Sequence, residues 1–231
     1  MSFSVNWDES VSARFPELAI CIGLINDVRV ERENNQIQVL REAVYEEVRV
    51  KYNIETLKDN RTVRAYRDFY WKLGIDPTKT RPSGEALLRR VLRGDELPQI
   101  STVVDAYNLA SVRTIIPISG FDKDRLDPPF QIRFARKAEA FTGIGMDKPM
   151  LLTDNMLVLA DEKRVLCVYP YRDSDYTKIT RETRNVIVVG YGALGIAGQM
   201  LKEAVEITLS YVKQVSGGQI EMVKVLNSTP K

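Results

Sequence analysis

Apolar residues recur with a helical period in the first half of this chain. Between residues 34 and 50 they recur at steps of three and four, with charged residues between them, at Ile37, Leu40, Val44 and Val48. This spacing predicts an amphipathic helix. Similar patterns predict three more helices, at residues 61–73, 83–93 and 100–112. Ser83 is the expected N-cap of its helix, and Gly74 and Gly94 are expected to end the helices that precede them.

The second half of the chain consists mainly of short apolar runs separated by Gly, Pro and Asp turns. Each run predicts a strand, at residues 114–118, 130–135, 150–152, 157–159, 165–169 and 186–189. An earlier apolar run at residues 18–25 predicts another buried strand. A long amphipathic helix is expected at residues 194–215, and a last strand at 220–226. Helices followed by strands, without regular alternation, are typical of an α+β protein.

Two of the predicted helices carry side chains that allow two interpretations. The helix at 61–73 holds an aromatic cluster, Tyr66, Phe69, Tyr70 and Trp71. This cluster predicts a helix packed on a core, and stacking on nucleic acid is the alternative. The helix at 83–93 carries Arg89, Arg90 and Arg93 on its polar side. These arginines fit a solvated helix face or, alternatively, a ridge that faces phosphates.

Composition limits the chemistry that this chain can perform. Its 231 residues are 44% hydrophobic and carry a net charge of +2, so the total charge gives no reason to expect DNA as a partner. The absence of histidine excludes Ser-His-Asp and Cys-His catalysis and leaves no zinc ligand cluster, so we expect neither metal nor cofactor. Cys21 and Cys167 lie in apolar runs and are expected to be reduced core residues. No apolar run could span a bilayer and no signal-peptide pattern is present, which predicts no membrane partner and a cytoplasmic location.

Residues 190–195 match the glycine pattern G-x-G-x-x-G of dinucleotide-binding proteins. The pattern follows a predicted strand and precedes a predicted helix, as that motif requires. However, only 36 residues follow Gly195, too few for the further βα units of a dinucleotide-binding fold. We therefore favour a close strand-to-helix turn. A nucleotide-cofactor protein that uses Gly190–Gly195 stays as the less favoured alternative.

Three motifs occur in order between residues 81 and 192. They are Val103-Val104-Asp105-Ala106-Tyr107-Asn108, Pro117-Ile118-Ser119-Gly120-Phe121-Asp122, and Asp173-Ser174-Asp175 leading to Glu182-Thr183-Arg184-Asn185-Val186. Together they resemble the editing (B-three/B-four) module of the phenylalanyl-tRNA synthetase beta subunit. The resemblance implies mixed, mostly antiparallel sheets with helices on the outside. It also implies a module at residues 81–231 with an N-terminal extension, residues 1–80, packed on it.

The resemblance implies a function in translation quality control. The family's module hydrolyses the ester of a mischarged tRNA, so a free-standing copy is expected to act in trans on an aminoacylated tRNA acceptor end. A non-catalytic module that binds tRNA or an amino acid is the alternative. The resemblance implies no aminoacylation, and a homo-oligomer is left open because aromatic residues near Trp71 could form an interface.

Site residues follow from the resemblance, position by position. Asp175 and Ser119 are the candidate catalytic residues, and the candidate tRNA-binding residues are Arg81, Arg89, Arg93 and Arg113. The candidate substrate-binding residues are Tyr107, Asn108, Gly120, Asp173, Gly190 and Gly192. Ser119, Tyr107 and Asp175 stand where the family usually has histidine, threonine and glutamate. Backbone N–H groups near Gly190 and Gly192 are expected to stabilise a developing oxyanion.

Overall fold

The computed structural model describes residues 4–229. Its α-helices are α1 (Glu9–Arg14), α2 (Asn35–Lys51), α3 (Arg61–Lys72), α4 (Ser83–Leu92), α5 (Thr102–Thr114) and α6 (Gly198–Ser216). Its strands are β1 (Val5–Trp7), β2 (Ala19–Asn26), β3 (Ile118–Asp122), β4 (Phe130–Phe134), β5 (Ala140–Phe141), β6 (Met150–Leu151), β7 (Leu157–Ala160), β8 (Val165–Val168), β9 (Arg172–Asp173), β10 (Val186–Tyr191) and β11 (Gln219–Asn227). The chain is therefore an α+β protein, as the order of its patterns predicted.

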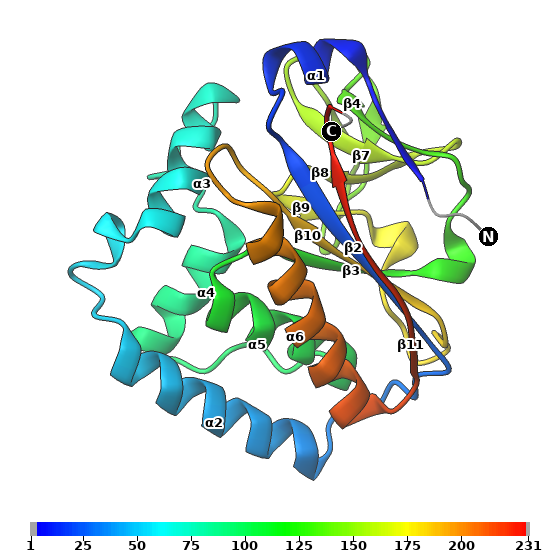
Figure 1. Ribbon diagram of the computed structural model, residues 1–231. Helices are drawn as coiled ribbons and strands as arrows, with labels where there is room; N and C mark the ends of the chain where they lie inside the picture. The colour runs from blue at the N-terminus through cyan, green and yellow to red at the C-terminus, as the bar shows by residue number, and fades with distance from the viewer. Residues whose placement is uncertain (1–3, 230–231) are drawn as a thin grey trace.

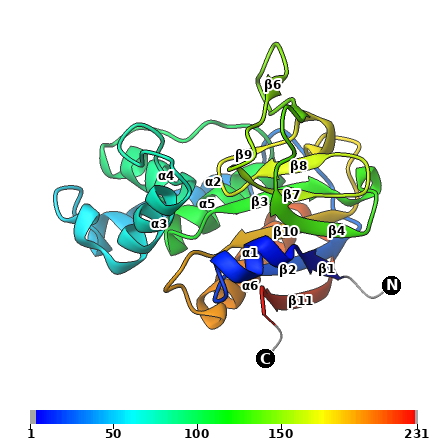
Figure 2. The same cartoon turned by 90° about the horizontal axis from the view of Figure 1, so that it is seen from above.

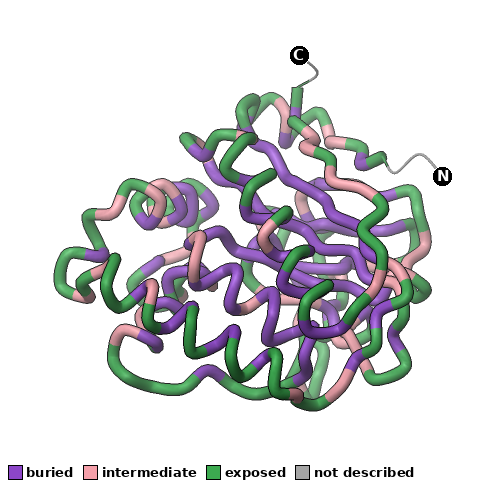
Figure 3. The backbone as a smooth tube through the Cα atoms, turned by 60° about the horizontal axis from the view of Figure 1, so that its bottom comes forward, coloured by how far each residue is buried: buried purple, intermediate pink, exposed green. Residues whose placement is uncertain are grey.

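Two sheets form the centre of the molecule (Figure 1). One has the antiparallel order β11-β2-β10-β3, and the other has the order β1-β4-β7-β8-β9, in which only β1 and β4 run parallel. Apolar side chains from both sheets meet between them, among them Ile22 and Phe121 from the first and Leu159 and Leu166 from the second. Figure 3 shows this central region as continuously buried chain. The contact brings the edge strands β3 and β9 near each other (Figure 2).

Helices cover the other face and one side of the four-stranded sheet. A side chain at Gly23 in β2 would meet Val205 and Leu209 of α6, so this glycine allows the helix to lie close to the sheet. α5 packs between α6 and α4 and also contacts β3. α3 and α4 lie beyond α5, away from the N-terminus (Figures 1 and 2). This arrangement holds α5 beside β3, where Tyr107 reaches Gly120.

Several sequence predictions needed correction. The strand expected at 114–118 is wrong, because α5 continues to Thr114 and Ile115 turns the chain in a left-handed conformation (φ 64°) before β3 begins at Ile118. Ser83 is not an N-cap, since Pro82 occupies that position and Ser83 is the first helical residue. α6 begins at Gly198 rather than 194, after a loop in which Gly195 has a φ of 85°. β1 and α1 were missed because three and six residues are too few to show a period.

Other predictions are confirmed. Tyr66, Phe69 and Tyr70 are buried in the core, whereas Trp71 is 56% exposed. Cys21 and Cys167 are free and buried. The division of the chain at residue 80 stays a prediction. β2, from the first 80 residues, is paired on both sides by β10 and β11, which come from the last 50.

A substitution at Gly84 tests the packing that holds α5 in place. A Cβ there would lie 2.4 Å from the carbonyl oxygen of Ile115. Alanine improves helix propensity by about 1 kcal/mol, but this backbone cannot move without shifting α5. We expect Gly84→Ala to lower the free energy of unfolding by roughly 1–3 kcal/mol, measured by urea denaturation.

Gly198→Ala is the matched control. Gly198, like Gly84, lies in the first turn of a helix, and a Cβ there would meet only the end of the Val225 side chain, at 3.1 Å. We expect its effect to stay within about 0.5 kcal/mol. Equal effects of the two substitutions would contradict the close contact of α4 with the Ile115 turn.

Candidate functional site

The contact between the two sheets brings Ser119 and Asp173 together. Ser119 lies in β3, the edge strand of one sheet, and Asp173 ends β9, the edge strand of the other. The Ser119 hydroxyl donates a hydrogen bond to Asp173 Oδ1 at 2.6 Å. The two residues are 54 positions apart in sequence, so tertiary structure alone creates this pair.

Tyr107 of α5 completes the cluster from the opposite face of β3. Successive strand residues point to opposite faces, so Ser119 faces β9 while Gly120 faces α5. A Cβ at Gly120 would lie 2.7 Å from the Tyr107 ring, so the ring packs directly on this glycine. Burial raises the pKa of the Tyr107 hydroxyl, and the nearby charge of Asp173 raises it further.

Asp173 has unusual acid–base properties. Burial raises the pKa of its carboxyl from 3.8 to about 7, although the hydrogen bond from Ser119 opposes this rise. Two buried groups that sequence reasoning missed lie close by, the Cys167 thiol and the Tyr191 hydroxyl. Burial raises the pKa of both groups, and the charge of Asp173 adds to the rise. Sequence marked Cys167 only as a core residue and Tyr191 only as part of the glycine pattern.

Asp175 differs from Asp173 in its surroundings. Its carboxylate accepts a hydrogen bond from Lys178 at 2.8 Å, and both side chains are 42% exposed. Its backbone N–H donates to the carbonyl of Thr142. The structure therefore pairs Asp173, not Asp175, with Ser119. Asn108 follows Tyr107 on α5 and is partly buried.

Two glycines of the G-x-G-x-x-G pattern, Gly190 and Gly192, serve close packing. A Cβ at Gly192 would lie 2.3 Å from the carbonyl oxygen of Ala19, and one at Gly190 would lie 3.0 Å from Val205. The Gly192 N–H already donates to the Ala19 carbonyl at 3.0 Å. The expectation that this N–H stabilises an oxyanion is therefore wrong. α6 begins six residues after Gly192, so its N-terminus does not follow the glycine turn directly.

The four candidate arginines divide into two pairs. Arg89 contacts the buried carboxylate of Glu85 at 2.6 Å, and Arg67 contacts the same carboxylate at 2.5 Å. Arg113 contacts Glu47 and the hydroxyl of Tyr211. These two arginines are engaged within the protein, whereas Arg81 and Arg93 are exposed.

The principal hollows of the described chain are lined by other residues. One of about 260 Å³ lies between the loop after α3 and strands β7 and β8, with Leu73, Met150, Asn155 and Tyr169 among its walls. A larger one of about 850 Å³ lies beside β11, against Met222 and Phe130. None of the candidate site residues lines either of these hollows. Within residues 4–229, no group of three or more acidic or cysteine side chains could hold a metal ion, and no helix is both long and apolar enough to cross a membrane.

Comparisons with known proteins agree with the motifs. The model of the B3/4 domain family matches residues 65–211, and the chain belongs to this family. It is similar to phenylalanine–tRNA ligase beta subunits: 23% identical over 165 residues to that of Haemophilus ducreyi (61% of this chain, 21% of that one) and 22% over 202 residues to that of Pectobacterium atrosepticum (85% and 24%). The chain thus spans about a quarter or less of the length of these relatives.

A solved structure also resembles this chain. It is an N-terminal fragment of the phenylalanyl-tRNA synthetase beta subunit from Pyrococcus horikoshii, with a TM-score of 0.49 and 15% identity, covering 95% of this chain and 52% of that one.

The raised pKa of Asp173 predicts a pH-dependent stability. Between pH 4 and 7 the folded protein keeps a proton on this carboxyl that the unfolded chain has already released. The free energy of unfolding contributed by Asp173 is therefore present at low pH and is lost as the pH rises to about 7. We expect the free energy of unfolding of the wild type, minus that of Asp173→Asn, to fall by roughly 1–3 kcal/mol between pH 4.5 and 8. Urea denaturation of both proteins across this pH range measures the difference.

Asp147→Asn, at an exposed position, is the control and should follow the wild type across this range. A difference between wild type and Asp173→Asn that stays constant with pH would show that Asp173 titrates normally.

Proposed function

We propose that this chain hydrolyses the ester of a mischarged aminoacyl-tRNA in trans, with Asp173 and Ser119 at its catalytic centre. Membership of the B3/4 family and similarity to tRNA ligase subunits support tRNA as the substrate class. The hydrogen bond between Ser119 and Asp173 is the observation that carries the proposal, because it places a hydroxyl on a carboxylate that titrates near neutral pH. Such an activity belongs in the cytoplasm, where aminoacylated tRNA is used.

The chemistry required is modest, since an aminoacyl ester is already activated. Deprotonated Asp173 accepts a proton from a water molecule as the water oxygen attacks the ester carbonyl carbon. The bond from that carbon to the ribose oxygen then breaks, and the proton passes to this oxygen. Ser119 donates to Asp173, so its oxygen lone pairs are free to hold the attacking water in place. Asp175, two residues after Asp173, pairs with the α-ammonium group of the substrate in place of Lys178.

Tyr107 sets the size of the amino acid in this proposal. Its ring lies against Gly120, on the opposite face of β3 from Ser119, and close enough to Asp173 for the charge of that carboxylate to raise the pKa of the Tyr107 hydroxyl. In this proposal the ring limits the amino acid to a side chain smaller than that of tyrosine. The same ring favours the second candidate function, a non-catalytic module that binds tRNA or an amino acid.

Deacylation of a panel of mischarged tRNAs tests the catalytic assignment. We expect Asp173→Asn to lower the hydrolysis rate by roughly 100-fold or more, because the proton acceptor is lost. Ser119→Ala should lower it by roughly tenfold, because the water is less well placed. The wild-type rate should rise with pH and level off above about 7, where Asp173 is deprotonated.

Two variants separate this assignment from its alternatives. Asp147→Asn is the charge-matched control and should leave the rate unchanged, and Asp175→Asn should lower it less than Asp173→Asn. Full activity of Asp173→Asn would contradict the proposal. Tight binding of uncharged and charged tRNA, with no hydrolysis of any ester, would favour the non-catalytic module.

Tyr107→Thr tests the size limit. Removing the ring opens space beside Gly120, so we expect the ratio of hydrolysis rates for large over small aminoacyl groups to rise by roughly tenfold. The measurement compares tyrosyl and alanyl esters on the same tRNA. An unchanged ratio would show that Tyr107 does not line the amino-acid pocket.

A further inference from the structure

Positive charge is concentrated in one short part of this chain. Residues 61–93, from the start of α3 to the end of α4, contain nine basic and three acidic residues, a net charge of +6. The whole chain carries +2, so the remaining 198 residues carry a net charge of −4. Such asymmetry is the electrostatic mark of a surface for a polyanion, which a modest total charge hides.

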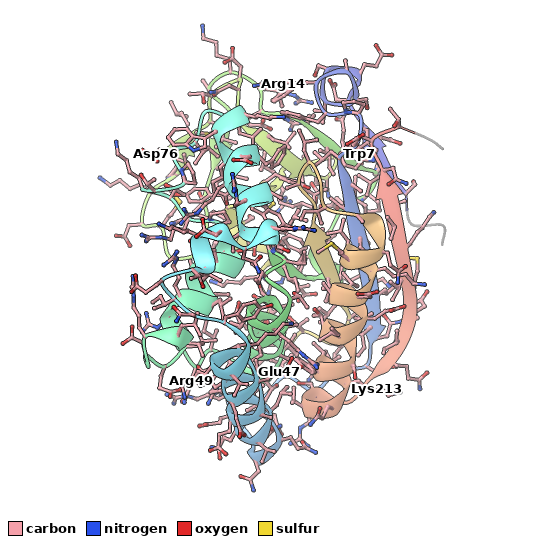
Figure 4. All side chains as sticks on the ribbon, turned by 60° about the vertical axis from the view of Figure 1, so that its left-hand side comes forward. Trp7, Arg14, Glu47, Arg49, Asp76 and Lys213 are labelled. Atoms are coloured by element: carbon pink, nitrogen blue, oxygen red, sulfur yellow. The ribbon has the colours of Figure 1, made fainter. Side chains whose placement is uncertain are left out.

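The two helices that hold this charge lie next to each other at one side of the molecule (Figures 1 and 4). Buried Glu85 of α4 fixes their relative position, because it contacts Arg67 of α3 at 2.5 Å and Arg89 of α4 at 2.6 Å. Opposite charges hold the pKa of Glu85 below its usual value despite its burial, which opposes this shift. The carboxylate therefore stays charged, and the other basic side chains are left to the surface.

Arg90 is exposed and donates a hydrogen bond to the carbonyl of Glu96. Five other basic residues of these helices and the segments beside them are exposed, and their side chains form neither an ion pair nor a hydrogen bond within residues 4–229. They are Arg61, Arg64, Lys72, Arg81 and Arg93, and together they form the α3–α4 basic surface. Arg61 and Arg64 are three positions apart in α3 and so lie on one face of that helix. The acidic residues nearby are Asp68 within α3 and Asp76, which contacts Lys79. Asp95 and Glu96 follow α4 and bound the surface at that end.

An exposed aromatic side chain accompanies this charge. Trp71, on the same exposed side of α3 as Arg64, is 56% exposed although the other aromatic residues of the helix are buried. Arginines bind phosphates, and an exposed indole ring stacks on an unpaired base. We propose that the α3–α4 basic surface binds the sugar–phosphate backbone of tRNA, with Trp71 against an unpaired base. The identity of the RNA rests on the proposed function, whereas the surface itself does not.

Charge reversal on each helix tests this surface. The double variant Arg64→Glu/Arg93→Glu changes one exposed residue of α3 and the exposed residue that follows α4, and it leaves the Glu85 contacts in place. We expect at least a tenfold weaker Kd for unmodified tRNA by filter binding at 100 mM salt. The slope of log K against log salt should become less steep by about 1.5–2, as for two lost phosphate contacts. Trp71→Ala should weaken binding by severalfold without changing this slope.

Lys137→Glu/Lys148→Glu is the matched control, with the same change of charge at exposed positions outside α3 and α4. Its Kd for tRNA should stay within about threefold of the wild-type value, because salt at 100 mM screens the effect of charges far from the bound RNA. The proposed surface would be contradicted if both double variants lost the same affinity for tRNA, or if Arg64→Glu/Arg93→Glu bound tRNA as tightly as the wild type. Equally tight binding of a duplex DNA would overturn tRNA as its partner.

A minimal substrate separates this inference from the proposed function. A short 3′-aminoacylated oligonucleotide reaches the Asp173 centre without a tRNA body, so Arg64→Glu/Arg93→Glu should hydrolyse it at the wild-type rate. If the wild type hydrolyses no ester but its tRNA binding still depends on Arg64 and Arg93, the catalytic proposal fails and the surface stands. If hydrolysis depends on Asp173 but the affinity for tRNA is the same without Arg64 and Arg93, the proposed surface is wrong and the catalytic proposal stands.

Discussion

The packing of the two sheets against each other is the constraint on which the rest of this structure depends. Apolar side chains such as Phe121 and Leu166 fill the space between them, and their burial removes water from the adjoining edge strands. Asp173 lies at that margin, where water is partly excluded and its charge is disfavoured. The hydroxyl of Ser119 partly offsets this cost. A carboxyl that titrates near neutral pH is thus a consequence of how the core is built.

The family motifs contain residues that hold the fold together as well as residues at the site. Asp105 of the first motif forms a buried ion pair with Arg41 at 3.0 Å and so joins α5 to α2. Asp122 of the second motif accepts a hydrogen bond from Thr183 of the third at 2.7 Å. These carboxylates have structural partners, which separates them from Asp173. The motifs therefore mark the framework around the site more than the chemistry within it.

Much of the fold could be predicted from the sequence, because long periodic segments such as α2 and apolar runs such as β2 signal their structure locally. The strand expected before Ile118 could not, since the left-handed turn at Ile115 depends on contacts with α4. The pairing of the sheets likewise joins residues far apart in sequence. The α+β class and the family therefore followed from local pattern and motif, whereas strand order did not.

The site shows the same division. Ser119, Gly120, Tyr107 and Asp173 were all named from motifs, but only the structure shows that Asp173 rather than Asp175 meets the serine. Sequence spacing could not distinguish two aspartates that are separated by a single residue. The roles of Arg89 and Arg113 also depended on partners, Glu85 and Glu47, that lie on other turns or other helices. Burial and pairing decide which of these side chains meet, and neither is visible in the order of residues.

The most direct test of the central claim is the titration of the Asp173 carboxyl itself. Carboxyl-carbon NMR of protein labelled at aspartate, with the resonance assigned by its loss in Asp173→Asn, reports this group alone. The structure predicts a titration midpoint near pH 7. Because the hydrogen bond from Ser119 lowers the pKa of Asp173, Ser119→Ala should move this midpoint upward. A midpoint near 4, unchanged in Ser119→Ala, would contradict the account of a desolvated, serine-paired carboxylate at this site.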